Sequence, residues 1–186
     1  MRKIIYAINM TVDGCCDHTK MLADEEIHEH YARLVRSVDV LVFGRLTYQL
    51  MVPYWPDIAS NTSGQTKSDI DFAQAFCSVS RIVVFSRSLA RVEEERTRIV
   101  RANLKDEMVK LTQESGKDIL VGGVSIPSQL MELGLIDEYR FVVQPTIAGE
   151  GRRLFGGVNL ADRLQLKLVD SSTLKSGCVA LRYLKR

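Results

Sequence analysis

Short apolar runs and amphipathic segments alternate over the first three quarters of the chain. Apolar runs that end at glycine or polar residues are typical of strands buried on both faces of a sheet. They predict strands over 4–10, 40–43, 81–85, 97–101 and 118–121. Between the strands, apolar residues three and four apart predict helices over 25–37, 45–51, 70–77, 104–115 and 125–133. Asp24, Asp69 and Asn103 are suited to cap three of these helices.

The last quarter of the chain has a different pattern. A strand over 138–144 and a glycine-rich loop over 145–157 come first, and alternation of apolar and polar residues at 164–168 and 179–183 predicts two further strands. Ser176 and Gly177 lie between them, so we expect an antiparallel hairpin at the end. The eight strands predict a three-layer α/β/α fold around a mixed sheet. No repeat, low-complexity tract or linker interrupts residues 1–186, which predicts a single domain.

The segment 53–68 is rich in proline, asparagine, serine and glycine, and it predicts a long loop. A polar loop of this length is often a cover over an active site or a contact with a partner. Trp55 lies within it, so its side chain either covers a flat substrate or packs at a dimer contact.

Composition excludes several classes of protein. Apolar residues make up 46% of the chain and charged residues 26%, and the net charge of +2 is too small to argue for binding to nucleic acid or to a membrane surface. No apolar stretch approaches the length of a membrane span. The four cysteines lack the spacing of a metal site, which predicts reduced thiols and a cytoplasmic location.

Three strand ends carry the residue types that suit a phosphorylated ligand. The turns are Gly44-Arg45-Leu46-Thr47, Ser86-Arg87 and Gly122-Gly123-Val124-Ser125-Ile126. Ligands of wound α/β sheets bind beyond the carboxyl ends of the strands. Glycines allow backbone to approach a pyrophosphate, a helix start offers free N–H groups, and two arginines could enclose the 2′-phosphate of NADP. The common Rossmann fingerprint and the P-loop motif are both missing from the sequence.

These turns, together with Thr11-Val12-Asp13-Gly14 and the late Pro145-x-x-x-Gly149-x-Gly151-x-x-Leu154-Phe155, resemble the dihydrofolate-reductase-like superfamily. The most similar branch is the reductase domain of bacterial riboflavin biosynthesis and its stand-alone relatives. The resemblance extends from Ile4 to about Tyr183. It implies NADPH as the cofactor, a small-molecule substrate and a homodimer.

The resemblance also implies roles for individual residues. Arg45 and Thr47, after Gly44, would meet the phosphates of NADPH, and Ser86 and Arg87 would bind its adenosine 2′-phosphate. The turn and helix start Gly122, Gly123, Val124, Ser125 and Ile126 would hold the pyrophosphate. Ala7 would lie near the nicotinamide and Asp13 near the substrate. Neither the resemblance nor the residues identify a proton donor.

One departure from the family pattern concerns the substrate. Dihydrofolate reductases carry a pterin-binding carboxylate on the first long helix, and the corresponding place here is near His28, where Glu29 is the only acid. This argues against folate. His28 and His30 are two residues apart and point to different sides of a helix, so both are interpreted as surface residues. Arg152 and Arg153 are either solvated or hold an anionic substrate.

The residues and the resemblance together favour hydride transfer from NADPH to a C=N or C=O bond of a small heterocyclic, pyrimidine- or pterin-like substrate, or of a carbonyl compound. The alternative is a protein that binds NADPH or another nucleotide without turning it over. A flavin- or pyridine-cofactor enzyme of the Rossmann type is disfavoured because its fingerprint is missing.

Overall fold

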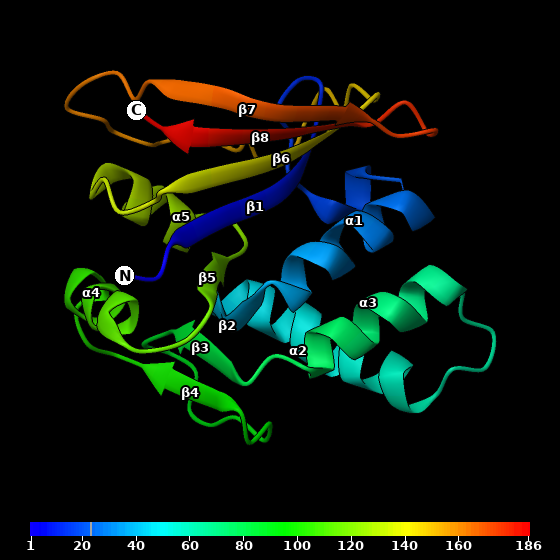
Figure 1. The fold of residues 1–186 in the computed structure, drawn as a ribbon, viewed down its shortest axis with the longest axis horizontal. Helices are drawn as coiled ribbons and strands as arrows, with labels where there is room; N and C mark the ends of the chain where they lie inside the picture. The colour runs from blue at the N-terminus through cyan, green and yellow to red at the C-terminus, as the bar shows by residue number, and fades with distance from the viewer. Residues whose placement is uncertain (23) are drawn as a thin grey trace.

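An eight-stranded sheet runs through the computed structural model, which describes residues 1–22 and 24–186 (Figure 1). The strands are β1 (Ile4–Thr11), β2 (Val38–Gly44), β3 (Arg81–Phe85), β4 (Thr97–Val100), β5 (Asp118–Val121), β6 (Glu138–Gln144), β7 (Leu166–Thr173) and β8 (Val179–Lys185). Their order across the sheet is β4-β3-β2-β5-β1-β6-β8-β7. The first six strands are parallel, and β8 runs antiparallel to β6 and to β7. The predicted mixed sheet and its C-terminal hairpin are confirmed.

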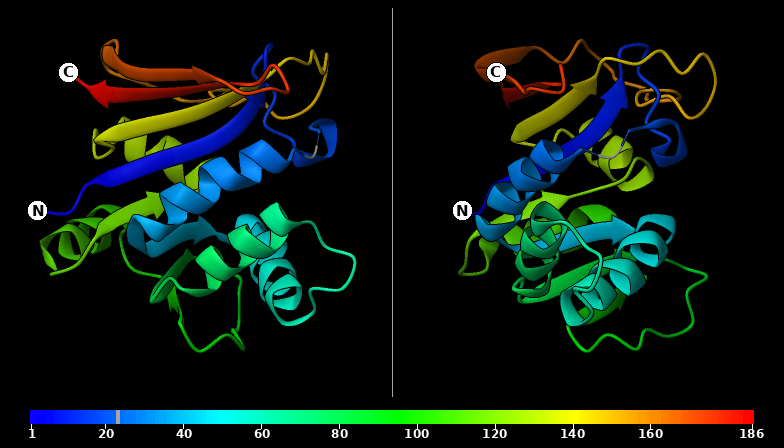
Figure 2. Two further views of the ribbon diagram at one scale, coloured as in Figure 1. Left: turned by 45° about the vertical axis from the view of Figure 1, so that its right-hand side comes forward. Right: turned by 90° about the vertical axis from the view of Figure 1, so that its right-hand side faces the viewer.

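Helices cover both faces of the sheet. The helices α1 (Glu25–Arg36), α2 (Arg45–Ser60) and α3 (Lys67–Cys77) lie on one face, and α4 (Leu104–Gln113) and α5 (Ser125–Glu132) lie on the other (Figures 1 and 2). Because successive side chains of a strand point to opposite faces of the sheet, the hydrophobic core is divided into two parts, one on each face. In β2, Leu41 and Phe43 pack toward α1, α2 and α3, whereas Val40 and Val42 pack toward α4 and α5. The three-layer prediction is therefore confirmed.

The helix that follows β2 is longer than the sequence predicts. The predicted helix start at Arg45 is confirmed, but the predicted end at Met51 and the expected loop over 53–68 are wrong, because α2 continues through Pro53 and Pro56 to Ser60. Tyr48, Val52, Trp55 and Ile58 are buried at helical spacing along this helix. Burial of this stripe outweighs the cost of an internal proline, about 3 kcal/mol.

The start of α3 also differs from the prediction. Asp69 was expected to cap this helix, but the cap is Thr66 and the helix begins at Lys67. The two residues form a capping box, in which the Thr66 hydroxyl accepts from the Asp69 N–H and the Asp69 carboxylate accepts from the Thr66 N–H, both at 3.2 Å. A threonine three residues before an aspartate is the ordinary signature of such a box. Its effect is to fix the Asp69 carboxylate.

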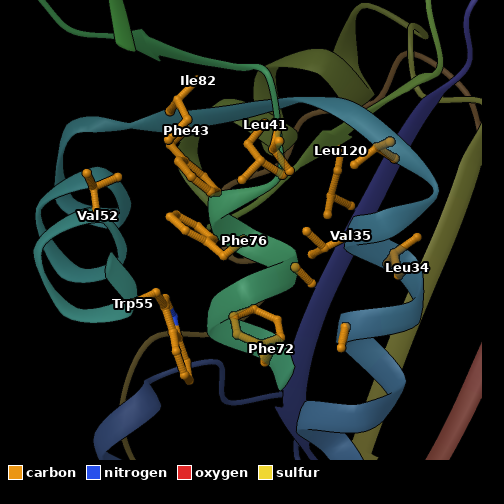
Figure 3. Packing of buried hydrophobic residues seen from close by; sticks show 14 of the residues in the cluster. Leu34, Val35, Leu41, Phe43, Val52, Trp55, Phe72, Phe76, Ile82 and Leu120 are labelled. Carbon is orange, nitrogen blue, oxygen red and sulfur yellow. The ribbon is translucent and has the colours of Figure 1, made fainter. Parts of the chain in front are cut away.

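Within the helical layer on this face of the sheet, α2 and α3 pack against each other through aromatic side chains. The rings of Trp55 and Phe72 lie 4.4 Å apart, and Figure 3 shows them together with Phe76 between the two helices.

All four cysteines are free thiols, as the sequence predicts. Among the described residues, no helix combines the length and the apolar character needed to cross a bilayer.

Candidate functional site

Two helices begin at the carboxyl edge of the parallel strands, and both begin without a side-chain cap. Gly44 precedes α2 and Val124 precedes α5, and neither gives the helix a side-chain hydrogen bond. By contrast, Asp24, Thr66 and Asn103 cap α1, α3 and α4 through their side chains. Helix N-termini with open N–H groups and a positive dipole end are suited to bind an anion.

The two uncapped helix starts lie against each other. A Cβ added to Gly44 would stand 3.3 Å from Ser125 Oγ and 3.4 Å from Ile126 Cγ1, so a larger residue would push the starts apart. These three positions are among those predicted from sequence to hold phosphates. The structure brings them together at the ends of β2 and β5.

The Gly122-Gly123 turn is shaped by close neighbours. A Cβ on Gly122 would lie 2.9 Å from the Phe43 ring, and a Cβ on Gly123 would collide with the Thr47 hydroxyl. Gly123 also has a φ of +83°, which side chains rarely adopt. The buried Tyr6 hydroxyl donates to the Gly123 carbonyl at 3.0 Å, and burial raises the pKa of Tyr6 so that it keeps its proton. This turn therefore has one well-defined conformation.

A polar cavity of about 440 Å³ lies on the β3–β4 side of the α5 start. It is lined by Phe85, Ser86, Arg87, Val100, Arg101, Ala102, Leu104, Ser125, Ile126 and Gln129. The predicted group of Ser86, Arg87, Ser125 and Ile126 therefore shares one cavity. Arg101 was missed, although it directly follows β4 and so belongs to the same sheet edge. Its guanidinium donates to the Leu89 carbonyl at 2.6 Å.

Arg45, unlike Arg87, does not line the polar cavity. It is exposed and donates to Gln49 Oε1 at 2.9 Å, one turn further along α2. Of the cavities at this edge in the described chain, none has Arg45 in its lining. A phosphate role for Arg45 would therefore require its side chain to turn.

An aromatic cavity of about 310 Å³ lies on the other side of the Gly122-Gly123 turn, under α1, α2 and α3. Its lining comprises Ala7, Ile8, Asn9, His18, Ile27, His28, Tyr31, Val35, Leu41, Phe43, Thr47, Met51, Trp55, Phe72, Phe76, Leu120, Gly122 and Gly123. A groove of about 600 Å³ shares Ile8, Asn9, His18, Thr47 and Gly123 with this cavity and continues past Val124. The groove and the two cavities thus follow one sheet edge around the start of α5.

Two polar atoms buried at the aromatic cavity lack hydrogen-bond partners. Within the part of the chain that the structure describes, Asn9 Oδ1 and the Tyr31 hydroxyl have no partner. Leaving a buried polar atom unsatisfied costs about 1–3 kcal/mol. Burial also raises the pKa of Tyr31, so its hydroxyl remains able to donate. The two atoms suit a ligand that carries complementary polar groups on a largely apolar body.

Trp55 belongs to the wall of this cavity. Its side chain comes from α2 and is only 8% exposed. Figure 3 shows its ring directed toward Phe72. The structure therefore places Trp55 on a helix and in a cavity wall, and not on the predicted loop.

The interpretation of His28 as a surface residue is wrong. Its side chain is 26% exposed, lines the aromatic cavity and meets the Trp55 ring edge-on at 5.4 Å. Its Nδ1 lies 2.7 Å from Asp69 Oδ1. No local sequence pattern indicates this pair, because it joins α1 to α3 across 41 positions of the chain. Glu29, the one acid expected near this place, is exposed and does not line the cavity.

A family model described as the RibD C-terminal domain matches residues 2–180. The chain belongs to this family.

Individual proteins that resemble this RibD C-terminal domain agree with that assignment. The YyaP protein of Bacillus subtilis (strain 168), itself uncharacterized, is 28% identical over 98% of this chain and 94% of its own. The structure of a pyrimidine reductase-like protein from Corynebacterium diphtheriae superposes with a TM-score of 0.71 at 16% identity, covering 100% of this chain and 92% of that one. A deaminase/5-amino-6-(5-phosphoribosylamino)uracil reductase from Thermotoga maritima has a TM-score of 0.67 at 16% identity, and the match covers 100% of this chain and 57% of that one. These structures share the fold.

In this member of the family, Asp13 lies away from the aromatic cavity and holds the glycine-rich loop. Its carboxylate accepts from the Thr11 hydroxyl at 2.5 Å and from the N–H groups of Ala148 and Gly149 at 3.1 and 3.0 Å, and it pairs with Arg153 at 2.8 Å. The Thr11 hydrogen bond is the main cause that lowers the pKa of Asp13. These contacts give Asp13 a structural reason to be present.

Two other candidates from the sequence can be placed. Arg153 is engaged with Asp13, whereas Arg152 lines the groove beside the aromatic cavity. Among the described residues, no group of three histidine, cysteine or acidic side chains is arranged to hold a metal ion.

Proposed function

We propose that this RibD C-terminal-domain protein is an NADPH-dependent reductase that transfers a hydride to a small pyrimidine- or pterin-like heterocycle or to a carbonyl substrate. The observation that carries the proposal is the pair of uncapped helix starts at one sheet edge, with a polar cavity on one side and an aromatic cavity on the other. A dinucleotide needs an anion site between two unlike ends, and this edge supplies that arrangement.

The residues present fit this cofactor. Gly44, Gly122 and Gly123 let Ser125, Phe43 and Thr47 pack close to the backbone, which brings the two helix starts together at one edge. The open N–H groups of Ser125 and Ile126 would bind the pyrophosphate. Thr47 would assist from the groove side. When bound, NADPH supplies the hydride, and the chain's own residues bind, orient and exclude water.

The 2′-phosphate of the adenosine end would lie in the polar cavity. Ser86 and Arg87 line it from the end of β3, and Arg101 lines it from the end of β4. Two guanidinium groups beside a hydroxyl suit a phosphate better than a free ribose hydroxyl. This placement supports NADPH over NADH.

The substrate would occupy the aromatic cavity next to Ala7. The cavity is lined mainly by apolar and aromatic side chains, and no lysine or arginine is among its lining residues in the described chain. A neutral ring stacked near Trp55 would satisfy this environment. The pyrimidine reductase-like name carried by one related structure agrees with such a ring. Asp13 is left out of this proposal, since it does not line the cavity and its carboxylate is engaged by the glycine-rich loop.

We extend the proposal to the location and the oligomeric state of the protein. It would act in the cytoplasm as a homodimer on a small molecule, without nucleic acid or membrane. The exposed side chains of Leu168 and Val169 on the edge strand β7 offer apolar surface for self-association. Light scattering of the purified protein tests the dimer.

Cofactor titration tests the proposed function. Binding of NADPH and of NADH is followed by cofactor fluorescence in the wild type and in Arg87→Ala. We expect micromolar NADPH binding in the wild type and a loss of at least tenfold in Arg87→Ala, with NADH affinity changed less than twofold. Arg91→Ala is the matched control, because Arg91 is 86% exposed and carries the same charge outside the cavity.

The outcomes separate the hypotheses. Failure of both cofactors to bind below the millimolar range would refute the cofactor site. Equal losses for NADPH and NADH in Arg87→Ala would refute its 2′-phosphate role. If NADPH binds but no pyrimidine, pterin or quinone oxidises it, the non-catalytic alternative gains.

A further inference from the structure

His28 lines the aromatic cavity, and Asp69, which is not among the lining residues, fixes the orientation of its ring. His28 Nδ1 lies 2.7 Å from Asp69 Oδ1, and Asp69 uses its other oxygen to accept the Thr66 N–H at 3.2 Å. Burial pushes the pKa of Asp69 upward, but hydrogen bonds from Thr66 and the nearby His28 outweigh it and the net pKa falls. The carboxylate is therefore ionised at neutral pH. It holds the imidazole with its proton on Nδ1.

This arrangement leaves one nitrogen of the ring for chemistry. With Nδ1 engaged, Nε2 is the nitrogen that can exchange a proton with a ligand. The ring itself is held between Trp55, edge-on at 5.4 Å, and Phe72 at 6.0 Å. A histidine oriented by a carboxylate beside a ligand cavity is the usual arrangement of a general acid or base.

The other ionisable groups near the ring are less suited to this role. Tyr31 is buried and its pKa is raised, so its hydroxyl does not readily give up a proton at neutral pH. His18 also lines the cavity, but its side chain is 66% exposed and its nearest acid, Asp17, lies 3.9 Å away. Asp24 caps α1 one turn before His28, and its carboxylate is engaged by the N–H groups of the helix. Only His28 combines cavity access with a close, fixed carboxylate partner among these groups.

We propose that His28, positioned by Asp69, is the proton donor of the reduction. The inference rests on the proposed function and adds the residue that completes its reaction. When bound, NADPH would supply a hydride to the carbon of the substrate C=N or C=O bond, and the π electrons of that bond would move to nitrogen or oxygen. That atom takes the proton from Nε2 of the His28 imidazolium as the N–H bond breaks. The product is the amine or alcohol, and the neutral imidazole regains a proton from water.

The activity test compares His28→Gln with the wild type. NADPH oxidation is measured with 7,8-dihydropterin as a C=N acceptor and 9,10-phenanthrenequinone as a C=O acceptor. We expect kcat to fall about 100-fold while NADPH affinity changes less than twofold. The pH profile of kcat should differ between the wild type and His28→Gln. His30→Gln is the matched control, because His30 lies on the same helix outside the cavity lining.

A second variant tests Asp69 as a positioning residue. Asp69→Asn should lower kcat about tenfold and change the neutral imidazole tautomer of His28, seen in the ¹⁵N NMR spectrum of the protein without cofactor, from proton on Nδ1 to the ordinary mixture. Thr66→Ala is the control, because it weakens the same helix end but leaves the His28–Asp69 pair. Equal loss of kcat in Thr66→Ala, or an unchanged tautomer in Asp69→Asn, would show that Asp69 is merely structural.

The failures are distinguishable. If the wild type does not bind NADPH, the proposed function fails. If it binds and oxidises NADPH but His28→Gln stays within threefold of the wild type, only the present inference fails. If neither acceptor is reduced, the NMR measurement decides, because 7,8-dihydropterin must still shift the His28 Nε2 resonance. Absence of that shift would overturn the role of His28.

Discussion

The two cavities on either side of the α5 start are built by different means. The polar cavity is formed by residues that directly follow β3 and β4 and by the first turn of α5, and it lies open to solvent. The aromatic cavity is formed where α1, α2 and α3 pack together over the sheet, so its wall is also the hydrophobic core. We therefore expect substitutions in the polar cavity to change mainly ligand binding, and substitutions in the wall of the aromatic cavity to change mainly stability.

The largest expected effect is on the aromatic side. Trp55→Ala removes a ring that packs 4.4 Å from Phe72 in the core, and we expect the free energy of unfolding to fall by about 3 kcal/mol. Arg87→Ala on the polar side should change it by no more than about 0.5 kcal/mol. Urea denaturation of the two variants measures the contrast. A loss below about 1 kcal/mol for Trp55→Ala would show that the cavity wall is independent of the core.

A smaller effect on the free energy of unfolding is expected at Asp69, which takes part in the capping box of α3 and pairs with His28 of the aromatic cavity. Asp69→Asn should lower the free energy of unfolding by about 1 kcal/mol at pH 7, because the capping box and the His28 pair lose their charge. The pKa of Asp69 is lowered in the folded protein, so its contribution is present above the ordinary value of 3.8 and is lost as the pH falls through the folded value. Urea denaturation should show the difference from wild type shrinking between pH 7 and pH 3. A difference that stays constant with pH contradicts the ionic origin.

The smallest effect is expected at Arg101. Arg101→Ala should weaken NADPH about threefold, less than Arg87→Ala, because the Arg101 guanidinium is already engaged with the Leu89 carbonyl. NADH affinity should not change. Cofactor fluorescence titration measures both. A larger loss than in Arg87→Ala would assign the main 2′-phosphate contact to β4.

The sequence reveals the polar cavity better than the aromatic one, for a physical reason. Parallel strands bring their carboxyl ends to one edge, so Ser86, Arg87 and the helix start at Ser125 could be grouped from topology alone. Arg101 follows the same rule but was missed, because the predicted strand over 97–101 included it, whereas β4 ends one residue earlier at Val100. His28 and Asp69 obey no such rule, since they meet only through the packing of α1 against α3.

The fold itself followed from pattern wherever burial was periodic. The strand bounds were predicted to within two residues, because alternation and short apolar runs determine which face is buried, except that β7 ends at Thr173, five residues beyond the predicted end. The errors concern α2 and the start of α3. Local proline chemistry suggested a loop at Pro53 and Pro56, but the long-range burial of Trp55 and Ile58 prevailed.

One carboxylate, Asp69, closes the first turn of α3 and also holds the imidazole of His28. Helix ends are among the first parts of a fold to open, at free energies well below that of global unfolding. Fraying of this turn would release the ring while the sheet remains intact. On warming, the protein should therefore lose competence for proton transfer before it melts, and its working temperature would be set by one helical turn.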